Sequence, residues 1–278
     1  MNKLNKSYEG WDTNDHLNEF NFWNNLSAYE FNFRWGSFRE NQILIKILKK
    51  EDTLLEVGCA TGTTVRWLKN NNILKSINYL GIDLSNAAIK KAEYLHPNSK
   101  FKKVNLGPLK SYYNKYDYVF SRDTVMHQQN PFQFLEELIK CAKKSVIVRI
   151  RSRDNGITDF NFEDNCQLHY DKFWMPYIVL NINELIDFLK KLKVVNSIKI
   201  NRSYEVLGGQ VNRFLPKDLY FKSAGGAETT LEINLEKEKI SDSFRVFYDD
   251  SIEGRALINL KKRKRIIIKI LKTLKLLK

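Results

Sequence analysis

The stretch Leu54-Leu55-Glu56-Val57-Gly58-Cys59-Ala60-Thr61-Gly62 decides the fold of this chain of 278 residues. Its first four residues predict a short buried strand, and residues 63–70 predict the start of a helix. Gly58 and Gly62 allow the main chain between them to turn sharply and to approach a ligand closely. Glu56 is unusual, because a carboxylate inside an apolar run is costly unless another group pairs with it.

A second apolar run, Leu80-Gly81-Ile82-Asp83-Leu84-Ser85, carries another acid, Asp83. In nucleotide-binding α/β folds, an acid at this distance accepts hydrogen bonds from ribose hydroxyls. The two stretches resemble the class I S-adenosylmethionine-dependent methyltransferases, whose first motif is an acid, any residue, Gly, three residues and Gly. Glu56, Gly58 and Gly62 match that motif, and Asp83 matches the family's second acid. The nicotinamide fingerprint fits less well, because Ala60 and Thr63 stand at its positions.

The resemblance covers about residues 53–200 and is best up to residue 150. It implies an α/β fold, a doubly wound and mostly parallel seven-stranded Rossmann-like sheet, in an enzyme that uses S-adenosylmethionine. Many family members carry an acid near the end of the third strand that accepts the adenine amino group. Asn105 stands there in this chain and keeps an acceptor oxygen without the charge. The cofactor-binding residues that the resemblance implies are Glu56, Gly58, Cys59, Ala60, Gly62, Asp83, Leu84, Asn105, Leu106 and Ser121.

Alternating strand and helix patterns support a parallel sheet with helices on both faces. Helices are expected over residues 37–49, 86–95, 131–143 and 182–192, and later strands over 100–106, 116–121, 145–150, 194–200 and 244–248. Residues 201–243 are interpreted as an insertion between the last two strands. The predicted division is an N-terminal helical cap or lid (1–50), a methyltransferase domain (51–255) and a basic tail (256–278). The aromatic segment 151–181 is the candidate acceptor-binding segment.

His127 lies in the loop after the fourth predicted strand, where open α/β sheets bind ligands. A hydroxyl acceptor would profit from this imidazole as a general base, whereas an amine acceptor needs only to be neutral. The alternative is a structural histidine bonded to main chain. His169 and Tyr170 are second candidates, while His16 and His96 are expected outside the cleft. Arg122 and Asp123 could hold ligand groups or pair with each other.

Residues 256–278 contain nine Lys or Arg and no acid, so much of the net charge of +14 belongs to this tail. Ile266, Ile270, Leu274 and Leu277 fall on one helical stripe with lysines around it, as in interfacial amphipathic helices. The tail is therefore expected to bind an anionic membrane surface, to pack on the protein body or to contact a second copy.

Three cysteines without metal spacing, no secretory signal and no spanning run indicate a protein of the cytoplasm, peripheral at the membrane if its tail binds lipid. Nucleic acid is disfavoured as acceptor. Amino-methylating enzymes of DNA share an Asn/Asp/Ser-Pro-Pro-aromatic run after the fourth strand, where this chain has Ser121-Arg122-Asp123-Thr124. The preferred acceptor is a small molecule or a glycan-type hydroxyl or amine. The alternatives are a nucleic-acid or protein methyltransferase and a non-catalytic cofactor-binding module.

Overall fold

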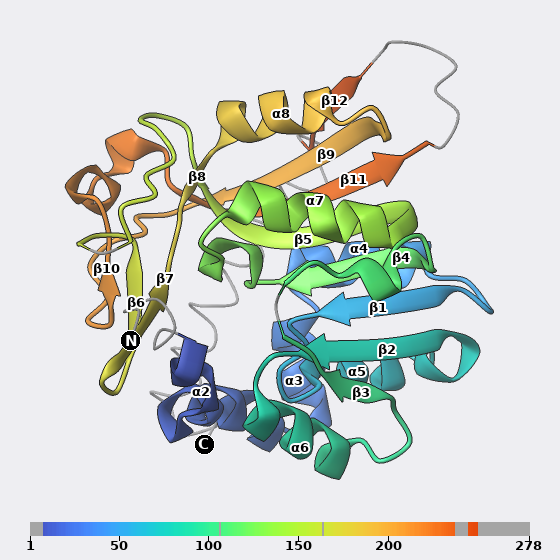
Figure 1. The fold of residues 1–278 in the computed structure, drawn as a ribbon. Helices are drawn as coiled ribbons and strands as arrows, with labels where there is room; N and C mark the ends of the chain where they lie inside the picture. Colours follow the sequence, from blue (N-terminus) through green and yellow to red (C-terminus); the bar gives the residue numbers. More distant parts are fainter. Residues whose placement is uncertain (1–7, 106, 163, 237–243, 250–278) are drawn as a thin grey trace.

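Strands alternate with helices from β1 to β5, with the 3-10 helix η3 (Lys110–Tyr112) between β3 and β4, and build a large sheet with helices on both faces (Figure 1). The computed structural model describes residues 8–105, 107–162, 164–236 and 244–249. Leu106 and the basic tail, about which the sequence makes predictions, lie outside the described residues. The strands of the large sheet are β1 (Thr53–Val57), β2 (Asn78–Asp83), β3 (Phe101–Lys103), β4 (Tyr116–Arg122), β5 (Ala142–Arg153), β8 (Leu180–Asn181), β9 (Val195–Tyr204), β11 (Ala227–Leu235) and β12 (Arg245–Tyr248). The helices are α2 (Asn14–Asn25), α3 (Ala28–Trp35), α4 (Arg39–Ile47), α5 (Thr63–Asn70), α6 (Asn86–Leu95), α7 (Pro131–Cys141) and α8 (Ile182–Lys191).

The large sheet has the strand order β12-β9-β11-β5-β4-β1-β2-β3, with the short β8 beside β5. β1 is parallel to both β2 and β4, and β4 is parallel to β5, whereas β11 is antiparallel to β5 and β9. A second sheet of order β10-β6-β7 contains β6 (Gln167–Tyr170), β7 (Phe173–Pro176) and β10 (Arg213–Phe214). The predicted fold class is confirmed, but within the described residues the large sheet has nine strands rather than seven.

The prediction that residues 201–243 form an insertion is wrong for β11, which lies between β5 and β9. The sequence does not predict this strand because threonines occupy buried positions in it, so polar and apolar residues do not alternate as in a typical half-buried strand. Thr229 is fully buried, and its hydroxyl lies 2.6 Å from that of Ser152 on β5. The predicted last strand, β12, is instead an extra edge strand parallel to β9.

Apolar side chains alternate between the two faces of the central strands, so both faces are buried. Leu55 and Val148 belong to the core that α7 and α8 cover. Leu54 and Ile147 point to the other face, where they pack with residues of α4 and α5. This double burial fixes the ends of β1, β2 and β4 relative to one another, which positions the loops that follow them.

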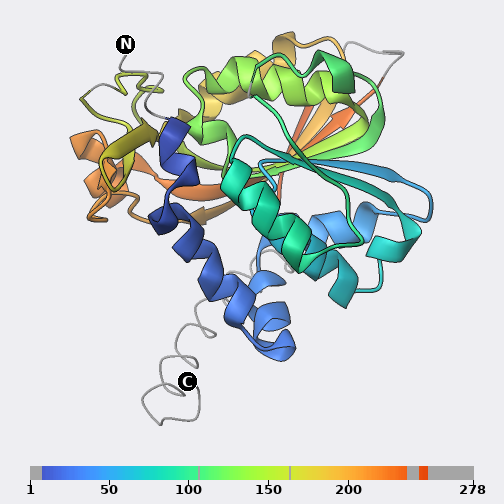
Figure 2. The same ribbon diagram turned by 60° about the horizontal axis from the view of Figure 1, so that its bottom comes forward.

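The N-terminal segment lies beyond the carboxyl ends of β1 and β2, at the same end of the large sheet as β6 and β7 (Figures 1 and 2). It begins with the 3-10 helix η1 (Tyr8–Asp12) and continues as α2. The hydroxyl of Ser85, the residue that caps α6, donates a hydrogen bond to the Asp12 carboxylate at 2.7 Å. The Arg66 guanidinium on α5 donates to the carbonyls of Trp23 and Leu26 at 2.7 and 2.6 Å. α2 is thus fastened before its start and at its end.

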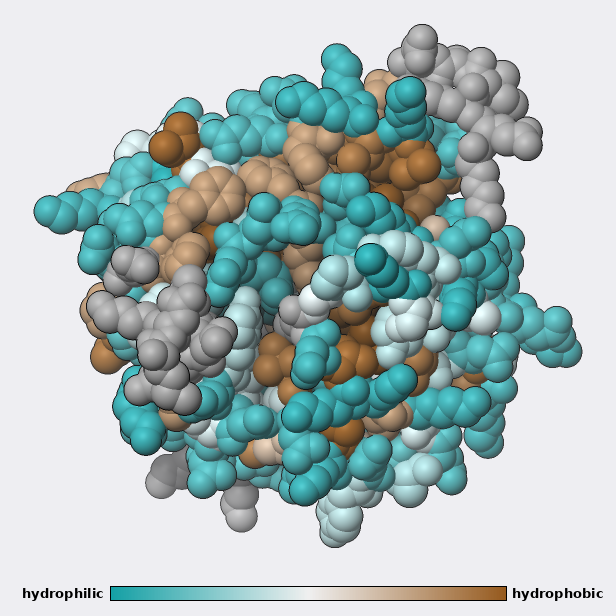
Figure 3. Space-filling model, in the orientation of Figure 1, coloured by the Kyte–Doolittle hydropathy of each residue, from teal (hydrophilic) through white to brown (hydrophobic). Residues whose placement is uncertain are grey.

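Hydrophilic side chains cover most of the face seen in Figure 3, and apolar side chains reach its surface in separate patches. Scattered patches of this kind are normal for a folded domain in water. Within the described part of the chain, no helix has the length and apolar character needed to cross a membrane.

Candidate functional site

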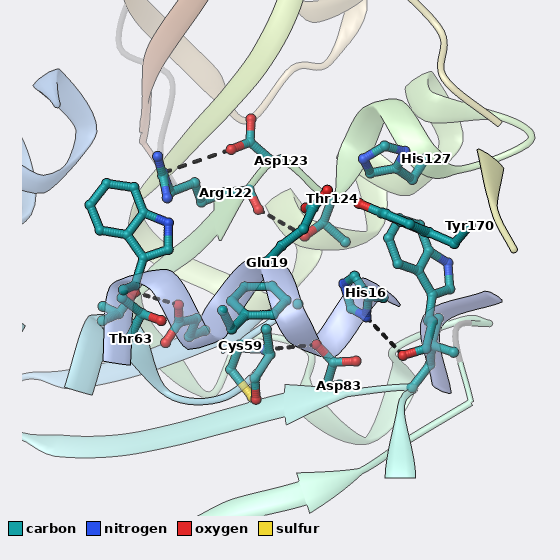
Figure 4. Close-up of a pocket in the computed structure, with 18 of the residues that line it drawn as sticks. His16, Glu19, Cys59, Thr63, Asp83, Arg122, Asp123, Thr124, His127 and Tyr170 are labelled. Atoms are coloured by element: carbon teal, nitrogen blue, oxygen red, sulfur yellow. Dashed lines mark hydrogen bonds and ion pairs between the residues drawn. The ribbon is translucent and has the colours of Figure 1, made fainter. Parts of the chain in front are cut away.

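A cavity of about 250 Å³ lies where the loops after β1, β2 and β4 meet the N-terminal segment (Figure 4). η1 and α2 supply one wall, the turn after β1 supplies another, and the loop after β4 supplies a third. The lining residues are Trp11, His16, Glu19, Phe20, Trp23, Trp35, Glu56, Gly58, Cys59, Ala60, Thr63, Thr64, Asp83, Leu84, Arg122, Asp123, Thr124, His127, Gln128 and Tyr170. The ends of parallel strands are where open α/β sheets bind ligands.

The turn after β1 depends on two glycines in the left-handed region, Gly58 at φ +81° and Gly62 at φ +80°. A Cβ at Gly58 would collide with the side chain of Thr124, so a larger residue would push the loop after β4 away. Gly62 precedes α5 directly and leaves the first amides of that helix without intrahelical partners. The turn therefore brings backbone donors and the loop after β4 to one cavity.

Glu56 is 3% exposed, and its partners are two hydroxyl groups rather than a cation. The Thr64 hydroxyl donates to Oε1 at 2.6 Å, and the Tyr79 hydroxyl donates to Oε2 at 2.5 Å. Burial raises the pKa of Glu56 to about 7, although both hydrogen bonds oppose the rise. A buried carboxylate without a cationic partner is stabilised by any positive ligand group that approaches it.

Asp83 ends β2 and joins the turn after β1 to the start of α6. Its Oδ2 accepts the N–H of Ala60 at 2.8 Å, and its Oδ1 accepts the N–H of Ser85 at 2.9 Å. Burial raises the pKa of this carboxyl group, and the backbone hydrogen bonds lower it. Each carboxylate oxygen retains acceptor capacity on the side of the cavity, which suits paired hydroxyl donors.

Two polar groups of lining residues are buried and have no hydrogen-bond partner among the described residues. They are the hydroxyl of Thr63, the first residue of α5, and the indole N–H of Trp35. Both groups can donate, and a buried donor without a partner costs free energy. This part of the cavity is therefore suited to a ligand group that carries acceptor oxygens, such as a carboxylate.

His127 lies in the loop after β4, lines the cavity and is 6% exposed. Its Nδ1 is 2.8 Å from the carbonyl oxygen of Pro176, and since a carbonyl only accepts, Nδ1 carries the proton. Nε2 therefore holds a lone pair. Burial lowers the pKa of His127 to about 4, so the ring is neutral at neutral pH. The two sequence interpretations are compatible, because the ring is both bonded to main chain and placed in the cleft.

Arg122 and Asp123, at the end of β4, belong to a buried ion-pair network. Arg122 Nε donates to the Glu40 carboxylate at 2.9 Å, and Asp123 pairs with Arg149 and Arg151 at 3.1 and 2.9 Å. Burial alone would raise the pKa of Asp123, but the arginines outweigh it and hold the pKa well below its usual range. Asp123 therefore stays ionised, and its charge is largely compensated from outside the cavity.

The structure brings together Glu56, Gly58, Cys59, Ala60, Asp83, Leu84 and His127 of the residues that the sequence nominates. Gly62, Asn105 and Ser121 do not line the cavity, and Leu106 lies outside the described residues. Asn105 is exposed, and the Ser121 hydroxyl donates to the Val57 carbonyl at 2.9 Å beneath the turn. Of the second candidates, Tyr170 lines the cavity and His169 does not.

The prediction that His16 lies outside the cleft is wrong, because His16 lines the cavity from α2. Glu19, one helical turn later on α2, also lines the cavity and has no counterpart among the nominated residues. The irregular aromatic sequence before Gly36 gave no helical period. The spacing of His16 and Glu19 by three residues is the signal that could have placed both on one helical face.

Residues 55–147 match the model of a family described as a methyltransferase domain. The match runs from β1 into β5 and so includes the loops after β1, β2 and β4. A search of curated proteins found no match.

Several solved structures are similar to this one at low sequence identity. MccD protein is 16% identical with a TM-score of 0.51, over 72% of this chain and 98% of that chain. The [4+2]-cyclase SpnF is 14% identical with a TM-score of 0.50, over 70% and 80%. Phosphoethanolamine N-methyltransferase 2 of Haemonchus contortus is 14% identical with a TM-score of 0.49, over 72% and 53%. At such low sequence identity these similarities concern the fold alone. One of the similar structures is a cyclase.

Proposed function

We propose that this protein is an S-adenosylmethionine-dependent enzyme that methylates a hydroxyl or amine of a small-molecule or glycan-type acceptor. The match of residues 55–147 to a methyltransferase-domain family supports the proposal. The observation that carries the proposal is the cavity, in which the turn after β1, Asp83 and His127 face an aromatic wall from η1 and α2. A cavity of about 250 Å³ suits a small reacting group.

The lining residues fit S-adenosylmethionine as cofactor. Asp83 offers two acceptor oxygens to ribose hydroxyls, and the unpartnered hydroxyl of Thr63 and indole N–H of Trp35 offer donors to the methionine carboxylate. Glu56, a carboxylate without a cationic partner, favours the positive charge of the cofactor. Bound S-adenosylmethionine supplies an activated methyl group on a sulfonium sulfur.

The protein's own contribution is orientation, exclusion of water and removal of a proton. His127 has a neutral ring with its Nδ1–H directed to Pro176, so Nε2 is the atom that can accept the acceptor's proton. Trp11, Phe20 and Tyr170 give the cavity an aromatic wall. We therefore propose His127 as the base toward a hydroxyl acceptor, and residues 8–36 as part of a lid.

The remaining proposals concern the ends of the chain and its location. Cys59, Cys141 and Cys166 are free and buried, which favours the reducing cytoplasm. The composition of the basic tail, residues 256–278, favours contact with anionic lipid. Such contact would bring the enzyme to membrane-proximal acceptors, for which a lipid-linked glycan is one candidate.

Methyl transfer from labelled S-adenosylmethionine to a panel of hydroxyl and amine acceptors tests the proposal, with cofactor binding measured by calorimetry on the same protein. Labelled product from a small molecule or glycan supports it. Binding of the cofactor without transfer to any acceptor would favour a non-catalytic module. Transfer only to nucleic acid or protein would favour the alternative class, for which retention on nucleic acid falls steeply with salt.

A further inference from the structure

We infer that the acceptor is an amine, held by the carboxylate of Glu19 and the Nε2 atoms of His16 and His127. The inference rests on the proposed function and narrows it from a hydroxyl or amine to an amine. It follows from two observations. One end of the cavity offers a ligand three hydrogen-bond acceptors, and the side chains that line the cavity include more carboxylates than cations.

The two imidazoles have the same arrangement. His16 Nδ1 lies 2.8 Å from the carbonyl oxygen of Trp11, as His127 Nδ1 does from that of Pro176, so each ring donates through Nδ1. The ring centroids of both lie 4.8 Å from that of Trp11, which places the imidazoles around one indole. Both rings are more than nine-tenths buried, and neither Nε2 has a hydrogen-bond partner in the described part of the chain. Burial keeps both rings neutral by lowering each pKa to about 4, so both Nε2 atoms act as acceptors.

Glu19 provides the third acceptor and the charge. Its side chain extends from α2 across the cavity toward Thr124 and Tyr170 (Figure 4). A hydrogen bond links the Tyr170 hydroxyl to the carboxylate of Glu19, which orients that carboxylate and leaves it further acceptor capacity. Glu19 is exposed at the cavity and can exchange protons with solvent.

The lining of the cavity favours a cation over an anion. Glu19, Glu56 and Asp83 form no ion pair among the described residues, although the more distant charges of Arg213 and Arg122 act on Glu19 and on Glu56. Arg122 is the one lysine or arginine of the described lining. Arg122 is already engaged, because its Nε donates to Glu40 and its guanidinium lies 4.1 Å from the Trp35 ring centroid. A phosphate or carboxylate on the acceptor would meet repulsion here, and an ammonium group would meet attraction.

An amine matches these acceptors in number as well as in charge. A primary ammonium group has three N–H donors for Glu19, His16 and His127, whereas a hydroxyl has one. After one proton passes to Glu19 and on to solvent, the nitrogen lone pair is free and two N–H donors remain. The nitrogen then bonds to the methyl carbon while the carbon–sulfur bond breaks and its electron pair stays on sulfur. The product is a methylated ammonium ion, and Glu19, again ionised, accepts a second proton from it and passes that proton to solvent.

The test uses the full chain, labelled S-adenosylmethionine and a small-molecule extract of the organism that encodes the protein. One half of the extract is first treated with an N-hydroxysuccinimide ester, which acylates amines and spares most hydroxyls. We expect labelled product from the untreated half and none from the treated half. Equal labelling of both halves would overturn the inference and leave the proposed function standing. No labelling of either half by a protein that binds the cofactor would overturn both.

Variants then test the residues on the acceptor purified from that extract. Glu19→Gln removes the charge and should raise the KM for the amine about 10- to 100-fold, with cofactor affinity unchanged. Asp15→Asn is the matched control, since it removes a carboxylate from the exposed side of the same helix. An unchanged KM in Glu19→Gln, or an equal rise in Asp15→Asn, would contradict the assignment of Glu19.

Discussion

Replacement of Glu56 by glutamine should stabilise the protein in the absence of cofactor. Glu56 is buried, and its two partners, Thr64 and Tyr79, are neutral hydroxyls. Burial raises its pKa from 4.5 to about 7, so above neutral pH the folded chain holds a carboxylate that the unfolded chain would ionise far more easily. Glutamine has nearly the same shape and never ionises.

The size of the effect follows from linkage between protonation and folding. The folded state binds the extra proton between pH 4.5 and about 7, so stability falls as the pH rises through this window. The full loss, reached above pH 7, is about 3 kcal/mol. Glutamine replaces one acceptor oxygen with an amide NH2 group, and the weaker hydrogen bonding lowers the free energy of unfolding by about 1 kcal/mol. At pH 8, Glu56→Gln should therefore be more stable by about 2 kcal/mol, and at pH 4.5 it should be slightly less stable.

Urea unfolding of the wild type and Glu56→Gln at pH 8 and pH 4.5 measures this difference. The comparison must be between variants at one pH, because protonation of His16 and His127 lowers the stability of both proteins as the pH falls from 6.5 toward 4. Glu93→Gln, on the exposed side of α6, is the control and should change little. Equal or lower stability of Glu56→Gln at pH 8 would refute the account, and weaker binding of S-adenosylmethionine by the same variant would show why a destabilising acid is present.

Three further predictions concern the cofactor, the base and the tail. Asp83→Asn should weaken S-adenosylmethionine binding by about 1.5–3 kcal/mol, and an unchanged Kd by calorimetry in a folded variant would place the site elsewhere. For a hydroxyl acceptor, His127→Ala should lower turnover on the order of 10²–10⁴-fold, and since the pKa of His127 is about 4, its own titration should not appear in pH–rate profiles above pH 5.5. Near-native turnover with a hydroxyl acceptor would leave His127 a structural role. For an amine acceptor, whose proton passes to Glu19, turnover should fall far less. Deletion of residues 266–278 should preserve cofactor affinity and reduce binding to anionic vesicles, whereas loss of folding or of a dimer would support a packed helix.

The sequence predicts the part of the fold in which apolar period and local chemistry agree. The helix expected over residues 86–95 is α6, with Ser85 as its cap, and Asn130 caps α7 with Pro131 at its first position. The glycine turn and Asp83 likewise lie on one cavity, because parallel strands place their carboxyl ends together.

The errors occur where polar side chains are buried and where tertiary contacts replace a local pattern. β5 extends to Arg153 because acidic residues pair with its arginines, as Asp123 does with Arg151, and β11 is hidden by buried threonines. His16 and Glu19 reach the cavity because Arg66 and Asp12 fasten α2 over it. Contacts between residues so far apart in the sequence produce no periodic pattern of apolar residues from which they could be predicted.

Arg66 also connects the two halves of the site mechanically. It lies on the first turn of α5, next to the glycine turn, and it holds the carbonyls at the end of the helix that carries His16 and Glu19. A displacement of the glycine turn or of α5 would therefore be transmitted through Arg66 to the end of α2. The fastening thus sets the spacing between the two walls of the cavity that the glycine turn and α2 provide.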